Sequence, residues 1–277
     1  MRILLLVCLM VGVAQAETPT QIAKKIVTAQ IEALADNNDL SGEAFAKTFA
    51  TDAVVMASYG GTAKNELGGI QSEIRGGMHA WVQSAKLVSL VAGGDDKVVW
   101  ISAEIDLANT SHTGPGVKTK ESYTLRVTEL AVSDGGKWKV VAAMFGRPGP
   151  ASRNKYPPLA IEGTTKRGSM TKFLVDPKQV AFQLPGKDDT VVVFGTDKSE
   201  KAVGAAAAKK LLESWKGLKL EIEGNVREVE GPTWGFVQAN ISWVKPGGPP
   251  YRLCALMIAT KEPSQPWVFR AIQFAND

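Results

Sequence analysis

Two carboxylates, Glu104 and Asp106, stand two residues apart in the apolar stretch "VVWISAEIDL" at residues 98–107. A pair of carboxyl groups can act as general acid and general base, one donating a proton and the other accepting it. Side chains alternate across a strand, so both carboxylates would share a face with Trp100 and Ser102. Because unpaired carboxylates in an apolar pocket lose their hydration, we expect both on a partly solvated outer face of a sheet.

The other residues able to move a proton are few. The sequence holds two histidines, His79 in "GGMHAWV" and His112 in "NTSHTGPG". Their spacing matches no metal-binding motif, and the sequence contains no nucleophile elbow or phosphate-binding glycine loop, so we expect neither a metal nor a cofactor. His112 is expected in a solvated turn. The candidates for acid–base chemistry are therefore Glu104, Asp106, His79 and Tyr123.

The chain begins with the pattern of a secretory signal peptide, "MRILLLVCLMVGVAQA". A cationic start, a short apolar core and Ala14-Gln15-Ala16 predict cleavage after Ala16 and a periplasmic or secreted protein. The apolar core is shorter than the roughly 20 residues of a membrane span, and no later run approaches that length. We therefore expect no membrane span once residues 1–16 are removed. Cys254 would then be the sole cysteine, which excludes an intramolecular disulfide.

The charge excludes some classes of partner. The formal net charge is +4, from 32 basic and 28 acidic side chains. This excess is small and spread along the chain, which argues against binding to nucleic acid or to an anionic membrane surface.

A linker divides the chain into two similar halves. The stretch between Gly146 and Met170 is rich in Pro, Gly and basic residues, which predicts a linker at 148–168 between domains at 17–147 and 169–277. Several short segments of the first half have similar counterparts in the second half, and these occur in the same order. The segment "VVWISAEIDL" corresponds to "TWGFVQANISW", and the hairpins that close the two halves share Trp138 with Trp267.

Each half is predicted to contain helices followed by antiparallel strands, an α+β pattern. The first helix should begin at Pro19 after a Thr18 cap, with one apolar stripe formed by Ile22, Ile26, Ala29, Ala33 and Leu34. A short helix at 43–49, a strand at 54–57 and a helix reaching Trp81 should follow. In the second half the clearest predicted helix is "EKAVGAAAAKKLLESW" at residues 200–215.

This order of elements, with "FATDAVV" at the first strand and the hairpin "GGKWKVVAAMF" at the end of a domain, resembles the SnoaL-like, or nuclear-transport-factor-2-like (NTF2-like), superfamily. The resemblance covers most of residues 20–147 and, more loosely, 170–277. It implies two cone-shaped domains, each with helices packed on a curved antiparallel sheet around a pocket. The second copy has a shortened N-terminal helix, so its pocket should be shallower or partly open.

The resemblance also implies where a catalytic base should lie. Isomerase and cyclase members of the superfamily carry an acid or histidine just after the "DAVV" strand. The matching residues here, 54–58 and 191–195, include neither. The missing base in both copies argues against proton abstraction.

The sequence therefore favours an exported tandem protein that binds a small apolar or amphipathic ligand, or a protein partner, without turning it over. One alternative is an isomerase- or cyclase-like enzyme that uses the four acid–base candidates in a rearranged site. Another is a structural interaction module. The aromatic side chains of Trp100, Trp234 and Phe236 are predicted to form an interface between the two domains, as in a pseudo-dimer within one chain.

Overall fold

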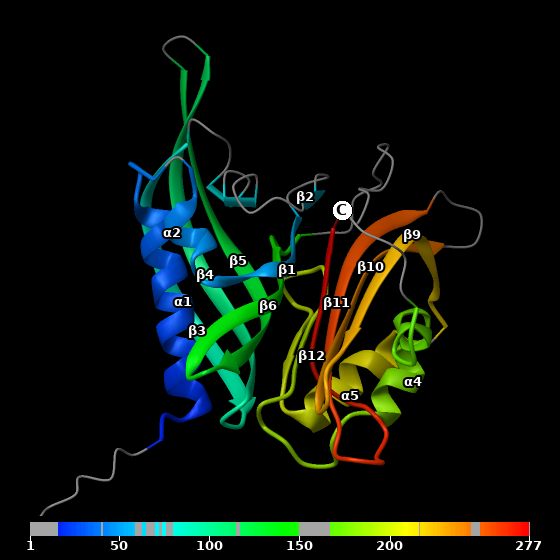
Figure 1. Cartoon of the computed structure of the whole chain (residues 1–277). Coiled ribbons are helices and arrows are strands. Elements are labelled where there is room, and N and C mark those ends of the chain that lie inside the picture. The colour runs from blue at the N-terminus through cyan, green and yellow to red at the C-terminus, as the bar shows by residue number, and fades with distance from the viewer. Residues whose placement is uncertain are drawn as a thin grey trace, which may run out of the picture.

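The computed structural model of the 277-residue chain describes residues 16–276, apart from residues 40, 59–62, 65–69, 72–73, 76–79, 115–116, 150–166, 216 and 245–249. The described part forms two six-stranded sheets, one from each half of the sequence (Figure 1). The linker predicted at 148–168 falls mostly outside these ranges, so the domain boundaries stay a prediction.

The first sheet has the strand order β2-β1-β6-β5-β4-β3. β1 pairs with β6 in parallel, and the other neighbouring strands are antiparallel. The strands are β1 (Phe49–Ser58), β2 (Ala63–Lys64), β3 (Trp81–Gly94), β4 (Val98–Gly114), β5 (Val117–Asp134) and β6 (Lys137–Gly146). β4 and β5 are long enough that their hairpin projects beyond the body of the molecule (Figure 1).

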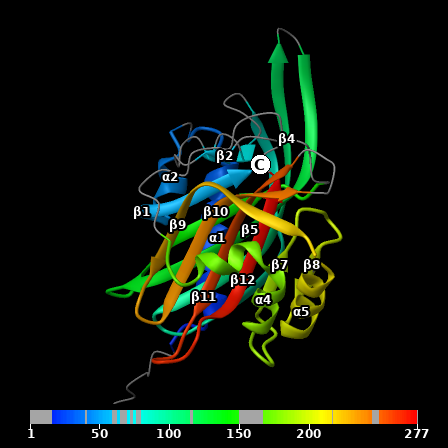
Figure 2. The same cartoon turned by 90° about the vertical axis from the view of Figure 1, so that its right-hand side faces the viewer.

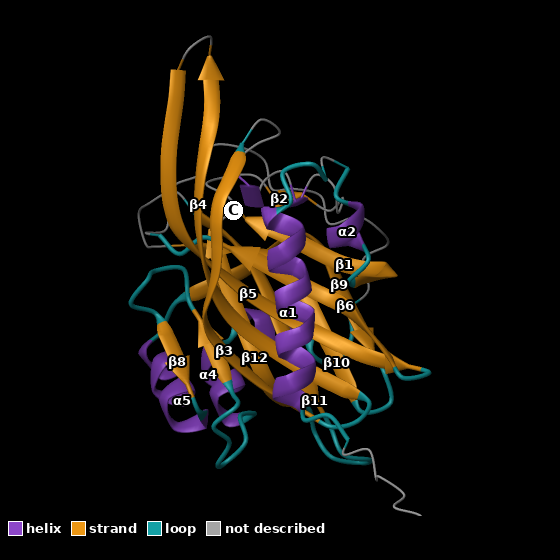
Figure 3. Cartoon of the chain, turned by 90° about the vertical axis from the view of Figure 1, so that its left-hand side faces the viewer, coloured by secondary structure: helices purple, strands orange, loops and turns teal. Residues whose placement is uncertain are grey.

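Helix α1 (Pro19–Ala35) covers the outer face of the first sheet (Figure 3), and the short α2 (Glu43–Ala46) follows it. Thr18 caps α1 as predicted: its hydroxyl oxygen accepts from the Gln21 backbone, and the Gln21 side chain accepts from the Thr18 backbone N–H. The predicted apolar stripe is wrong at one position. Ala29 is exposed, and Gln30 occupies the buried side of the helix instead.

The second sheet repeats this arrangement with the order β8-β7-β12-β11-β10-β9. β7 pairs with β12 in parallel, and the other neighbouring strands are antiparallel. The strands are β7 (Val192–Phe194), β8 (Lys201–Val203), β9 (Lys219–Glu230), β10 (Trp234–Val244), β11 (Tyr251–Thr260) and β12 (Val268–Asn276). Both halves therefore have the α+β architecture that the sequence predicts.

Short helices cover the second sheet in place of one long helix. They are the 3₁₀ helix η1 (Thr171–Val175), α4 (Pro177–Phe182) and α5 (Ala205–Ser214) (Figure 2). The predicted helix at 200–215 is too long, because residues 201–203 form β8 and Gly204 has φ = +85°. A residue with this left-handed φ cannot continue an α-helix, so α5 begins at Ala205.

A second correction concerns Trp81, which was predicted to lie in a helix. It is the first residue of β3 and is 57% exposed. Two glycines precede it closely in the sequence and disfavour a helix there, and the residues after it are rich in valine, which favours a strand.

The two sheets pack face to face, with helices on the outer side of each (Figures 1 and 2). The Gln238 side-chain amide donates to the Ala143 carbonyl at 3.3 Å, and the Gln273 amide donates to the Arg126 carbonyl at 3.2 Å. A continuous apolar cluster joins the sheets and includes Met56, Leu130 and Met144 from the first. The polar face of β4 therefore points toward the other half of the chain.

Candidate functional site

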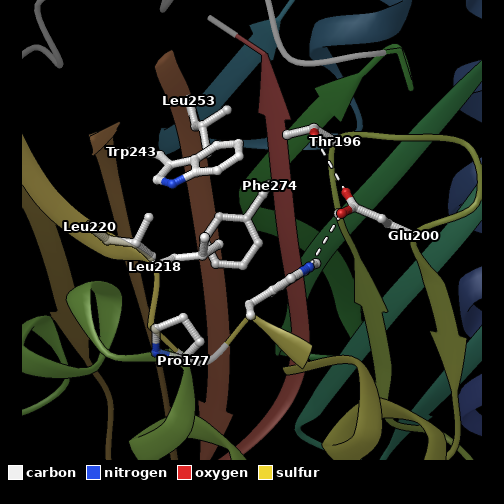
Figure 4. Close-up of a pocket in the computed structure, with 10 residues that line it drawn as sticks. Pro177, Thr196, Glu200, Leu218, Leu220, Trp243, Leu253 and Phe274 are labelled. Atoms are coloured by element: carbon white, nitrogen blue, oxygen red, sulfur yellow. Dashed lines mark hydrogen bonds between the residues drawn. The ribbon is translucent and has the colours of Figure 1, made fainter. Parts of the chain in front are cut away.

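A cavity of about 170 Å³ lies on the helix side of the second sheet (Figure 4). Its wall is mainly apolar and is formed by Pro177, Trp215, Leu218, Leu220, Trp243, Leu253 and Phe274. An engineered apolar cavity of about 150 Å³ is large enough to bind benzene. The cavity therefore has room for a molecule the size of one aromatic ring.

Strand register and aromatic packing fix the shape of this wall. Trp243 of β10, Leu253 of β11 and Phe274 of β12 share the helix-facing side of neighbouring strands. The Trp243 ring stacks on Tyr251 with centroids 5.0 Å apart, and Phe274 meets Trp215 edge to face at 5.5 Å. Such pairs hold large side chains in defined positions, so much of the cavity is preformed.

One end of the cavity is polar. It is formed by the loop between β7 and β8, residues 195–200, which we call the rim loop; Gly195, Thr196 and Glu200 line the cavity there. The Glu200 carboxylate accepts from the Trp215 indole N–H at 3.2 Å and from the Thr196 hydroxyl at 3.4 Å (Figure 4). It also accepts from the Asp197 backbone N–H at 3.0 Å. An apolar wall with one polar end is typical of a ligand pocket.

The outer side of the rim loop is held by Arg126, which belongs to β5 of the first sheet. Its guanidinium donates to four backbone carbonyls, those of Gly195 (3.0 Å), Asp197 (2.8 Å), Glu200 (3.2 Å) and Lys198 (2.8 Å). The Arg126 side chain is only 2% exposed. A residue of the first domain therefore satisfies backbone groups of the loop that lines the second domain's cavity.

Glu104, one of the two strand carboxylates, completes this contact. It accepts from the Arg126 guanidinium at 3.3 Å and pairs with Lys201 of β8. Burial acts to raise the pKa of Glu104, but hydrogen bonds from Lys201, Ser89 and Arg126 outweigh it and hold the pKa below its usual value. Glu104 is therefore a charged structural partner between the domains.

The other predicted acid–base residues that the structure describes, Asp106 and Tyr123, do not share a site with Glu104. Asp106 is exposed and accepts from the Thr124 hydroxyl at 2.7 Å. Tyr123 lies on the opposite, helix-facing side of the sheet, where its hydroxyl donates to the Ile74 carbonyl and its ring packs under Arg147. His79 lies outside the described residues. The structure thus does not gather Glu104, Asp106 and Tyr123 into one site.

A different carboxylate, Glu129, is buried in the first domain. It lies on the helix-facing side of β5 in register with Ile101, and its Oε1 accepts from the Gln30 amide at 2.7 Å. Burial raises its pKa to about 8, and the hydrogen bond from Gln30 only partly opposes this. Within the described structure, its Oε2 and the Gln30 Oε1 have no hydrogen-bond partner. Glu129 is therefore largely protonated at neutral pH.

The three aromatic residues predicted at the domain interface lie in or against the apolar cluster that joins the sheets. Trp100 is 8% exposed, donates to the Thr190 carbonyl at 3.3 Å and has the Arg270 guanidinium 5.1 Å from its ring centre. Phe236 is 1% exposed, and Trp234 is partly buried.

In the described part of the chain, no three side chains of His, Cys, Asp or Glu gather closely enough to hold a metal ion. No helix in the same ranges is both long and apolar enough to cross a membrane.

Sequence reasoning missed three of the functional side chains, Arg126, Glu129 and Glu200. The sequence did indicate that Glu129 is buried, because in "RVTELAV" it lies on the same strand face as the apolar residues Val127 and Ala131. No sequence pattern pointed to Arg126 or Glu200, because their roles depend on contacts between distant segments.

No protein-family model matches the chain, and no curated protein matches it. Among solved structures, an NTF2-like protein from Cytophaga hutchinsonii is 15% identical, with 45% of this chain and 93% of that chain covered and a TM-score of 0.35. A ketosteroid isomerase-like protein from Erwinia carotovora atroseptica is 16% identical, with 49% and 100% covered and a TM-score of 0.37. An uncharacterised protein with a cystatin-like fold from Caulobacter vibrioides is 16% identical, with 47% and 91% covered and a TM-score of 0.36.

Each of these structures is similar to about half of this chain. The order of elements predicted a resemblance to NTF2-like proteins, and NTF2-like and ketosteroid isomerase-like structures are among those similar to about half of the chain. The similarity concerns the fold alone and says nothing about what this chain binds.

Proposed function

We propose that the second domain binds a small apolar molecule of single-ring size that carries one hydrogen-bonding group, and releases it unchanged. The observation that carries this proposal is the cavity of about 170 Å³ with an apolar wall and one polar end. A filled core at this place would have favoured a purely structural module. The absence of an acid or histidine at 191–195 further supports binding without turnover.

The polar end indicates which ligand group is recognised. A carboxylate accepts hydrogen bonds and donates none, and its two oxygens have about four acceptor positions. Glu200 uses three of them for Trp215, Asp197 and Thr196. A ligand hydroxyl or amine that donates toward Glu200 or the Thr196 oxygen is therefore favoured over a ligand carboxylate, which Glu200 would repel.

We further propose that the protein works after export, in the periplasm or outside the cell. The support is the signal-peptide pattern at residues 1–16. In that setting the protein would capture its ligand from the surrounding medium.

Calorimetric titration with phenol and toluene tests the binding proposal. We expect phenol to bind with a Kd below about 1 mM, equivalent to about −4 kcal/mol. Leu253→Trp places an indole in the cavity and should abolish binding. Val203→Trp adds the same group at a position that is 41% exposed and should leave binding unchanged. Equal binding by wild type and Leu253→Trp would place the ligand elsewhere.

A second candidate function, acid–base chemistry in the first domain, is favoured by Glu129 alone. A buried carboxyl with a pKa of about 8 can donate a proton at neutral pH. Deuterium exchange next to the carbonyl group of a small apolar ketone, followed by NMR, would detect such chemistry. If wild type and Glu129→Gln exchange at the same rate, this candidate is excluded.

A further inference from the structure

We propose that Arg126 of the first domain is a positioning residue for the second domain's cavity: it holds the rim loop in the conformation that recognises the polar group of the ligand. This inference rests on the proposed binding function and names a residue that determines its selectivity.

The rim loop is clamped from two sides. On the cavity side, the Glu200 carboxylate accepts from the backbone N–H of Asp197, while the loop also closes through a bond from the Gly195 N–H to the Glu200 carbonyl at 2.8 Å. On the other side, Arg126 binds four of the loop's six carbonyl groups. A fifth, that of Thr196, accepts from the Gly149 N–H at 2.7 Å. The loop carbonyls are thus held largely by residues N-terminal to the second domain.

Arg126 is itself held rigidly. Its guanidinium lies 5.0 Å from the ring centre of Phe194 at the end of β7, and its Nε donates to Glu104. The arginine head group is planar and presents five donors in a fixed fork, so it can satisfy several carbonyls at once. Lysine keeps the charge but has three donors on a flexible stem and cannot reproduce this arrangement.

The loop geometry matters for the cavity because Gly195 leaves little room. A Cβ at this position would lie 2.4 Å from Glu200 Oε2 and 2.8 Å from the Trp215 ring. The lack of a side chain at Gly195 lets Glu200 and Trp215 pack directly on the loop backbone, so their positions depend on where that backbone lies. A shift of the carbonyls away from Arg126 would move the polar end of the cavity and leave the apolar wall in β10–β12 unchanged.

The test compares Arg126→Lys with Arg270→Lys in the full chain without its signal peptide. Arg270 is a matched control because it also lies at the domain interface, bound to Asp188 at 2.7 Å, and it donates no hydrogen bond to the rim loop in the described contacts. In wild type, phenol should bind about tenfold more tightly than toluene, the difference that one hydrogen bond supplies. Arg126→Lys should reduce this ratio to about twofold or less, with the Kd for toluene nearly unchanged, while Arg270→Lys keeps the wild-type ratio.

Hydrogen exchange measured by mass spectrometry provides a readout that needs no ligand. Amides of residues 195–201 should exchange faster in Arg126→Lys, and amides of β10 should not. An unchanged selectivity ratio together with unchanged exchange overturns the inference, as does an equal effect of Arg270→Lys. If wild type binds neither probe, the proposed function fails, and the exchange of the rim loop alone then decides whether Arg126 positions it.

Discussion

The Arg126 guanidinium and the Gly195 carbonyl form a hydrogen bond of 3.0 Å that ties the first sheet to the polar end of the second domain's cavity. Glu104 lies on the far side of the same guanidinium. The strand carboxylate that could have been a catalytic acid thus serves to orient a cation between two domains.

The Glu104–Arg126 pair should be energetically coupled. We expect Arg126→Met to lower the free energy of unfolding by about 3–5 kcal/mol, because it leaves buried rim-loop carbonyls without their arginine donor and removes one of the two cations that pair with Glu104. Glu104→Gln should cost less, and the two losses should overlap in the double variant by about 0.5–3 kcal/mol. Urea denaturation measures all three; strictly additive losses would show that the pair is not coupled.

Glu129 should make stability depend on pH. Between its unfolded pKa near 4.5 and its folded pKa of about 8, the folded protein keeps a proton that the unfolded chain has released. Stability therefore falls as the pH rises through this window. Glu129→Gln removes the penalty and should be more stable than wild type at pH 8, by up to roughly 3–5 kcal/mol, with the difference disappearing near pH 4.5.

Thermal or urea unfolding of both proteins from pH 4.5 to 8.5 measures this effect. Glu121→Gln is a control at an exposed position on the same strand and should follow the wild-type profile. Parallel profiles for wild type and Glu129→Gln would show that the carboxyl group is not buried as described.

Glu228 should anchor the start of the second domain. Its carboxylate accepts from the backbone N–H groups of Gly168, Met170 and Thr171 at 2.8, 2.8 and 2.9 Å, and it is 4% exposed. Glu228→Gln replaces the carboxylate acceptor of these hydrogen bonds with a neutral amide and should lower the free energy of unfolding by about 2–3 kcal/mol.

Limited proteolysis gives a local readout of the same change, since faster cleavage at residues 167–171 is expected in Glu228→Gln. Glu221→Gln, which removes a half-exposed partner of Lys219, should change stability by less than about 0.5 kcal/mol. A result in which both variants behave alike would remove Glu228 as an anchor.

Trp243 should set the size of the ligand. Its ring forms one wall of the cavity and stacks on Tyr251. Trp243→Ala should admit a two-ring molecule such as naphthalene, at a cost of about 3–5 kcal/mol in stability. Calorimetric titration with naphthalene should show binding to this variant and none to wild type. Trp81→Ala, at a position that is 57% exposed, should resemble wild type; naphthalene binding to all three proteins would contradict this role.

Local signals in the sequence predicted much of the fold. Thr18 and Pro19 predicted the start of α1, because capping and proline act on neighbouring backbone groups. Alternation along β4 predicted that Glu104 and Asp106 would share one face. Trp81 was placed in a helix because an apolar residue at a helical spacing cannot by itself be distinguished from one in a strand.

The site was less predictable. Trp100 on β4 was predicted to lie at the interface between the domains, whereas Glu104 and Asp106 on the same face were predicted to be partly solvated; in the structure Glu104 is paired and only Asp106, two residues further along the strand, is exposed. The partners of Glu104 are Arg126 and Lys201, which are far from it in sequence. The cavity joins residues of α4, of the segment after α5, of β9–β12 and of the rim loop, and such packing follows from the tertiary arrangement of elements rather than from any motif.

The measurement that tests the central claim most directly is the set of intermolecular nuclear Overhauser effects between bound phenol and the methyl groups of leucine. We predict contacts from the ring protons to Leu218, Leu220 and Leu253, which line the cavity. Contacts only to first-domain leucines such as Leu34 and Leu125, or none at millimolar phenol, would contradict the claim that the second domain holds the ligand.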